Sequence, residues 1–256
     1  MDGIVGSVHV HPLEDLSDYP AYRFPDPEHS TGLGPIDWQA FEREVARQKA
    51  RGEMTYGDLR HGHTFQQLCD IRGYLNTLMD LSDEEPETLD CMEQVIQFGI
   101  LAAKAGAHGL AMGDSVSALV SPRMYREYVQ LYAQQMIRRL KEATGLPVFY
   151  HVCGDTNHIL EYMVQTGADC IEVDSPVDMA RARQIAAGRC CVEGNVSTIE
   201  ALLQGTKEDV RREADHILQM FGNRGGVILS GACEIPRHSP RENVAELMRA
   251  AVEFPY

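Results

Sequence analysis

The chain has 256 residues, of which 44% are hydrophobic, and this is enough for one large domain with its own core. Its 38 acidic residues outnumber 23 Lys and Arg, so the formal net charge is −15, and a surface of this charge repels nucleic-acid phosphates. The sequence has neither an apolar run of the ~18 residues that a membrane span needs nor a signal-peptide core after Met1, and neither feature is expected.

Residues 1–50 are predicted to form an irregular, polar segment with one helix. Three prolines interrupt residues 19–27, which excludes a continuous helix there. The helix is expected over 37–51, beginning near Asp37. Residues 51–256 are expected to form one further domain, because its linkers are short.

From residue 51 onward, apolar runs alternate with amphipathic patterns. Strands are predicted near 54–58, 107–113, 147–153, 169–174, 189–193 and 226–232. Helices are predicted over about 63–80, 86–105, 122–143, 156–166, 178–187, 207–221 and 240–252. The expected N-caps are Ser121 and Ser239, each followed by proline, and Asp178 and Thr206.

Such alternation is typical of an α/β fold with a parallel sheet, and functional residues at the ends of strands favour a TIM (β/α)8 barrel. Only six strand candidates occur, whereas eight are needed. Either two strands lie within the first 50 residues or the barrel is incomplete.

The chain has seven cysteines, an odd number, and their spacing is not that of a disulfide framework. Both features favour a reducing, cytoplasmic setting. Five of them are interpreted as small buried hydrophobic residues. They are Cys69, Cys91, Cys170, Cys190 and Cys191.

The other two cysteines close apolar runs. His151 and Cys153 are two residues apart in one run, so they point to the same side of a strand. Cys233 closes another run, and parallel strands would bring it to the same edge. One imidazole and two thiolates with an open position suit catalytic zinc, and buried strand-end residues are the alternative. Asp155 and Glu234 adjoin these residues and are candidates for a fourth ligand or a supporting group, or for a helix cap or loop acid.

Polar side chains also follow other strands. Asp114, with Ser117 close behind it, could bind a polar group or transfer a proton, or it could simply cap a turn. Glu172 and Asp174 point the same way in a strand, and Asp174, at its end, is the better candidate.

Glu193-Gly-Asn195 follows the next strand, where glycine permits close approach of a ligand. The pair His61 and His63, in Arg60-His-Gly-His63, is interpreted as part of a polar loop rather than a metal site. Motifs for a phosphate-binding loop, a Rossmann dinucleotide site and a serine-hydrolase elbow are not found in the sequence.

Four of these segments, in this order and spacing, resemble the uroporphyrinogen decarboxylase-like superfamily. Within it they resemble the cobalamin-dependent branch of methylcobamide:coenzyme M methyltransferases and O-demethylase enzymes. The segments are residues 113–129, Tyr150-His-Val-Cys-Gly-Asp155, Glu193-Gly-Asn-Val196 and Ser230-Gly-Ala-Cys-Glu-Ile-Pro236. The resemblance runs from about His11 to the C-terminus and implies a (β/α)8 barrel over residues 51–256.

The resemblance also implies a zinc ion held by His151, Cys153 and Cys233, and a corrinoid (cobalamin) on a separate partner protein. The expected reaction moves a methyl group between that corrinoid and a small donor or thiol acceptor. Asp114 and Asp174 are then the expected catalytic residues, and the expected substrate-binding residues are Ser117, Glu193 and Asn195.

Two departures bear on the function. The first is that the resemblance implies further residues ahead of His11, including the first barrel strand or strands. The second is that this sequence carries the cysteine motif, which decarboxylases do not need. A tetrapyrrole decarboxylase, with Arg60, Arg123 and Arg237 holding carboxylates, is the second hypothesis. The third is an inactive or split-barrel subunit, whose exposed edge would drive association with a partner or with a second copy.

Overall fold

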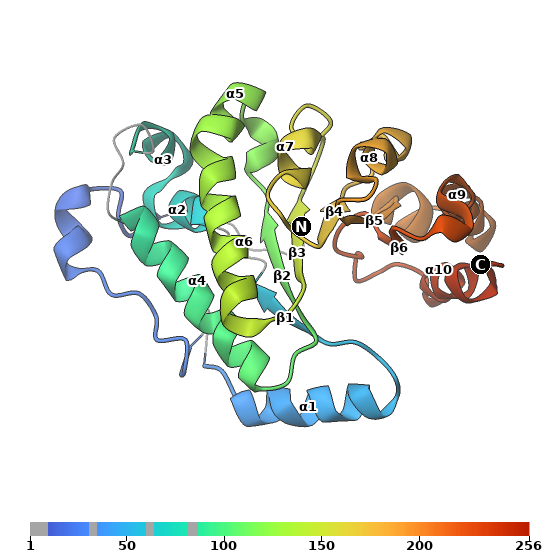
Figure 1. Ribbon diagram of the computed structural model, residues 1–256, viewed down its shortest axis with the longest axis horizontal. Helices are drawn as coiled ribbons and strands as arrows, with labels where there is room; N and C mark the ends of the chain where they lie inside the picture. The colour runs from blue at the N-terminus through green and yellow to red at the C-terminus, as the bar shows by residue number, and fades with distance from the viewer. Residues whose placement is uncertain (1–9, 31–34, 60–63, 81–86, 256) are drawn as a thin grey trace.

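The computed structural model describes residues 10–30, 35–59, 64–80 and 87–255 (Figure 1). Within these residues, six strands form one sheet in which all neighbours are parallel, and their order in the sheet is their order along the chain. They are β1 (Tyr56–Leu59), β2 (Gly109–Asp114), β3 (Val148–Val152), β4 (Cys170–Val173), β5 (Cys191–Val196) and β6 (Val227–Gly231). Each corresponds to a predicted strand, and the α/β architecture of a partial (β/α)8 barrel is confirmed.

Helices follow the strands and cover the outer face of the sheet, where α4 packs beside α6 and α9 beside α10 (Figure 1). The α-helices are α1 (Trp38–Ala50), α2 (Thr64–Arg72), α3 (Tyr74–Asp80), α4 (Glu87–Lys104), α5 (Pro122–Met124), α6 (Gln130–Thr144), α7 (Leu160–Val164), α8 (Met179–Ala186), α9 (Lys207–Phe221) and α10 (Arg241–Glu253). The other helical segments among the described residues are the 3₁₀-helices η1 (Leu16–Ala21), η3 (Ser117–Leu119) and η6 (Gly222–Arg224), and the π-helices η4 (Tyr125–Val129) and η5 (Thr198–Leu203). The division of the chain at residue 50 stays a prediction.

Three predicted helices differ in the structure, and the one expected over 156–166 is confined to the five residues Leu160–Val164. The helix expected over 63–80 is two helices, because Gly73 between them takes a positive φ of 87° that a continuing helix does not allow. The helix expected over 122–143 contains the π-helical turn η4, which inserts one residue into the helical repeat.

Three of the four predicted N-caps are confirmed. Ser121 accepts from the backbone of Met124, Asp178 accepts from two backbone amides, and Thr206 forms a capping box with Asp209. The prediction for Ser239 is wrong, because α10 begins one residue later than the Ser-Pro signal implies. Pro240 therefore occupies the N-cap and provides no side-chain acceptor.

Alternation along the strands separates two faces. Tyr150, Val152, Ile171 and Val173 point into the main core beneath the helices. On the opposite, concave face, Phe149 and Cys170 form a smaller apolar layer with neighbours such as Tyr56 and Ile228. His151, Glu172 and Glu193 share this concave face, one step nearer the carboxyl ends of the strands, and they stand side by side in the sheet register.

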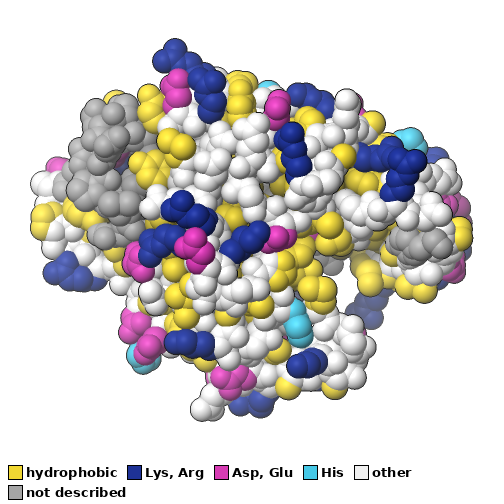
Figure 2. All heavy atoms as spheres, in the orientation of Figure 1, with side chains coloured by type: hydrophobic (Ala, Val, Ile, Leu, Met, Phe, Trp, Pro, Cys, Tyr) yellow, Lys and Arg dark blue, Asp and Glu magenta, His cyan; other side chains and the backbone are white. Residues whose placement is uncertain are grey.

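The surface shown in Figure 2 carries Lys and Arg side chains dispersed among apolar and acidic groups rather than gathered into one patch. Within the described residues, none of the helices combines the length and the apolar character that crossing a bilayer would require.

Candidate metal centre

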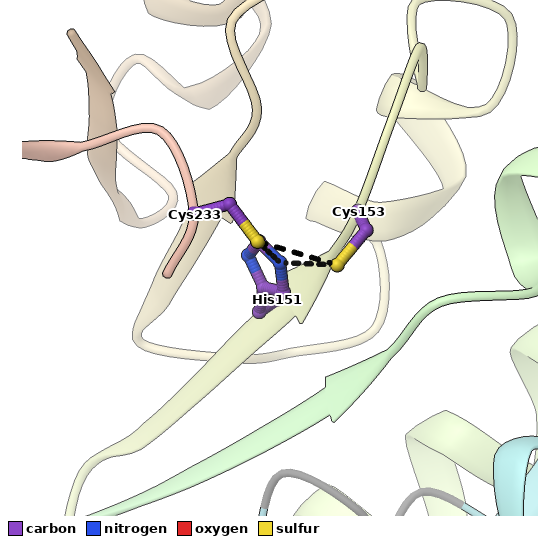
Figure 3. A group of neighbouring side chains, drawn as sticks. All are labelled: His151, Cys153 and Cys233. Atoms are coloured by element: carbon purple, nitrogen blue, oxygen red, sulfur yellow. Dashed lines mark hydrogen bonds between the residues drawn. The ribbon is translucent and has the colours of Figure 1, made fainter. Parts of the chain in front are cut away.

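One histidine and two cysteines converge at the carboxyl edge of the sheet (Figure 3). The Nε2 atom of His151 lies 2.9 Å from the Sγ of Cys153 and 3.7 Å from the Sγ of Cys233, and the two sulfurs are 3.6 Å apart. Zinc–ligand bonds of ~2.0–2.3 Å in a tetrahedron require ligand separations of ~3.6–3.8 Å. Two of the three edges already have this length, so the donor atoms suit a zinc ion once the His151–Cys153 edge opens slightly.

The curvature of the sheet brings Cys233 to this point. Cys153 follows β3 directly, and its amide donates to Asp114, so the backbone stays in line with the sheet. Cys233 follows β6, which is three strands away from β3 in the sheet. In a flat sheet, strands three positions apart would be separated by ~14 Å. The 3.6 Å contact between their sulfurs therefore needs the barrel-like curl of the sheet.

Hydrogen bonds among the three side chains change the pKa values of the two thiols. A hydrogen bond from the Cys153 thiol and then one from His151 lower the pKa of Cys233 well below that of a free thiol. The same contact with Cys233, followed by burial, raises the pKa of Cys153. One thiolate is thus stabilised before any metal arrives, and thiolate is the form of cysteine that binds zinc.

Glu172 lies behind the histidine. Its Oε1 is 3.6 Å from the Nδ1 of His151, the ring nitrogen that does not face the sulfurs, and both side chains are only 6% exposed. The sequence pattern predicts that Glu172 lies on this side of its strand, yet Asp174 at the strand end is the candidate it favours, because strand alternation does not reveal which neighbour on the next strand each acid meets.

Asp174 and Asn195 organise the loops beside His151 and Cys153. Asp174 accepts from the amide of Gly154, the residue directly after Cys153, at 2.8 Å. The side-chain amide of Asn195 donates to the carbonyl oxygens of Asp174 and Val177 at 3.1 and 3.0 Å. Both predicted site residues therefore lie at the carboxyl edge beside the cysteine cluster and hold its backbone in place.

Asp114 points the other way, toward the helices. Its carboxylate accepts from the amides of Val116 and Ser117 and from the hydroxyl of Ser117. Ser117 and Tyr150 also share a hydrogen bond, so these residues form a buried polar network. The structure thus gives Asp114 the turn-capping contacts that were the alternative, and its catalytic role and the substrate-binding role of Ser117 stay predictions.

Glu193 stands beside Glu172 in the sheet register and is half-buried. Its position on the concave face agrees with a substrate-binding role, which stays a prediction. Asp155 is exposed and bonds to Asn157, and the backbone amide of Glu234 supports Cys233. Neither acid belongs to the group of converging ligand atoms. The segment from Arg60 to His63 lies outside the described residues.

Comparison with known proteins shows which families the chain resembles. The curated proteins that resemble the chain include a methylated-thiol–coenzyme M methyltransferase of Methanosarcina mazei, 35% identical over 63% of this chain and 42% of the relative. A methylcobamide:CoM methyltransferase, MtaA, of Methanosarcina barkeri is 27% identical over 73% of this chain and 54% of the relative. A uroporphyrinogen decarboxylase of Legionella pneumophila is 31% identical over 59% and 42%. The chain spans about half the length of these relatives.

A solved methyltransferase from Methanosarcina mazei shares the fold, with a TM-score of 0.69 and 23% identity over 85% of this chain and 63% of that one. The family model described as uroporphyrinogen decarboxylase (URO-D) matches residues 64–254, which is most of the chain. The predicted resemblance is confirmed: the chain belongs to the uroporphyrinogen decarboxylase family.

Proposed function

We propose that the protein is a zinc-dependent methyltransferase that moves a methyl group between a corrinoid on a partner protein and a small donor or thiol acceptor. The observation that carries this proposal is the convergence of one imidazole nitrogen and two thiol sulfurs within 4.8 Å of one another. This donor set suits zinc with a position left for substrate. Relatives named as methyltransferases support the choice of reaction.

His151, Cys153 and Cys233 would hold the ion. When bound, zinc would supply Lewis acidity that turns a thiol into a thiolate nucleophile, or eases departure of an alkoxide or phenolate in the opposite kind of reaction. Asp174 and Asn195 would keep the ligand-bearing loops in position, and Glu193 would line the concave face beneath. The seven cysteines are all free, which supports a reducing cytoplasmic setting.

The partner corrinoid protein would dock over the carboxyl ends of the strands, where the ligand atoms gather. The functional residues of parallel barrels lie at that end, because the loops after the strands meet there.

Porphyrinogen decarboxylation is the alternative, and the relative of that name favours it at 31% identity. It requires cationic groups to hold carboxylates. Arg123 is exposed and pairs with Glu127, four residues on, and Arg237 is exposed in the loop after Cys233. Neither arginine lies in the cysteine cluster, which decarboxylation would leave without a role.

The test is an assay with methylcobalamin and coenzyme M, using zinc-loaded protein, metal-free protein and the Cys233→Ser variant. Methyl transfer by the loaded protein alone is the expected result. Decarboxylation of uroporphyrinogen that persists at full rate after zinc removal, with no methyl transfer, would overturn the proposal in favour of the alternative.

A further inference from the structure

We infer that Glu172 is a positioning residue of the metal centre, which holds the His151 ring so that its Nε2 faces the two sulfurs. The inference rests on the proposed zinc site and adds to it a residue that binds no metal. It follows from the contact between the Glu172 carboxylate and the far nitrogen of the ring.

The sheet register creates the contact. His151 and Glu172 are direct partners across the parallel pair β3 and β4, and both point to the concave face. In such a pair the side chains stand next to each other, so a carboxylate at position 172 meets the imidazole without help from any loop. The placement therefore belongs to the rigid part of the fold.

Both side chains are buried, so the contact between them matters energetically. Each is 6% exposed, and a carboxylate removed from water to that degree is costly unless an opposite dipole or charge faces it. The Oε1–Nδ1 separation of 3.6 Å lies within the range of a polar contact and is slightly too long for a hydrogen bond.

The chemistry explains why the contact would serve the metal. When Nε2 binds a metal, the ring proton must reside on Nδ1. A carboxylate at Nδ1 favours that tautomer, fixes the ring plane and makes Nε2 a better donor. Without Glu172 the ring would retain its place on β3 but lose both its preferred tautomer and its restraint.

The experiment measures Zn²⁺ affinity by competition with a chromophoric chelator for wild type, Glu172→Gln and Glu193→Gln. The second variant is the matched control, because it removes the same charge from the same register row one strand farther away. Glu172→Gln should bind Zn²⁺ about 10–100-fold more weakly. Glu193→Gln should bind as the wild type does.

The outcomes separate the inference from the proposed function. Equal affinities of wild type and Glu172→Gln would overturn the inference and leave the zinc site standing, and so would an equal loss in both variants. A wild type that does not bind Zn²⁺ would overturn the proposed function and the inference together.

A second measurement has its first readout in the wild type itself. Nitrogen-15 NMR of the zinc-loaded wild type should show the His151 proton on Nδ1, and Glu172→Gln should shift that resonance whereas Glu193→Gln should not. A His151 ring bound to the metal through Nδ1 would contradict the inference.

Discussion

The sulfur of Cys153 lies 3.6 Å from the sulfur of Cys233, although 80 residues separate them in the chain. The two residues follow strands that are not neighbours in the sheet. The contact is therefore a product of the curled sheet as a whole, and its chemistry depends on a fold that is intact from β3 to β6.

The first prediction concerns these two thiols. Cys153→Ser and Cys233→Ser should each lose bound zinc, because a hydroxyl is a far weaker zinc ligand than a thiolate. Cys190→Ser is the matched control, since Cys190 is also half-buried and free but lies just before β5, away from the cluster. Mass spectrometry of purified proteins gives the metal content. Zinc retained by Cys233→Ser at the control level would contradict the assignment.

Asp174 should act on the metal through the backbone. Asp174→Ala removes the acceptor of the Gly154 amide next to Cys153, so Zn²⁺ affinity should fall about 10-fold. Asp174→Asn keeps an acceptor oxygen and should recover most of that loss. Asp155→Ala is the control, because this exposed acid bonds to Asn157 instead. Chelator competition that gives the same affinity for Asp174→Ala and Asp155→Ala would argue against a positioning role.

Asn195 should contribute to stability. Asn195→Ala leaves the carbonyl oxygens of Asp174 and Val177 without this donor, and the free energy of unfolding should decrease by about 1–3 kcal/mol. The exposed Asn223 provides the comparison, and its change to alanine should stay within about 0.5 kcal/mol. Urea denaturation measures both values. An unchanged midpoint for Asn195→Ala would show that the two bonds contribute nothing.

The buried pair Tyr125 and Tyr150 predicts a loss of stability at high pH. Their hydroxyls are 3.0 Å apart, and burial first and then the neighbouring tyrosine raise the pKa of Tyr150 well above 10. The phenol stays protonated in the folded state, whereas the unfolded chain ionises above pH ~10. The stabilisation that each such group gives the folded state is therefore fully present below pH ~10. Above that pH the free energy of unfolding decreases by ~1.4 kcal/mol per pH unit for each group.

Tyr150→Phe removes one of these groups, so the slope of unfolding free energy against pH should become shallower by about 1.4 kcal/mol per unit. Urea denaturation from pH ~9 to ~11.5 measures the slope. Identical slopes for wild type and variant would mean that Tyr150 ionises in the folded protein.

The strands and the convergence of the three candidate ligands could be predicted from the sequence for related reasons. Alternation within one strand places His151 and Cys153 on one side, and parallel strands end at one edge, which is where Cys233 also arrives. Glu172 was passed over because its meeting with His151 depends on the register between β3 and β4. The turn role of Asp114 was weighed only as an alternative, since the contacts of a loop with its own backbone leave little trace in the pattern of residues.

The most direct test of the central claim is X-ray absorption at the zinc edge of the purified wild type, with metal content measured on the same sample. The account predicts about one zinc per chain, with two sulfur ligands at ~2.3 Å and at least one nitrogen at ~2.0–2.1 Å. A protein that takes up no zinc, or that binds it only through nitrogen and oxygen, would contradict a centre built from His151, Cys153 and Cys233.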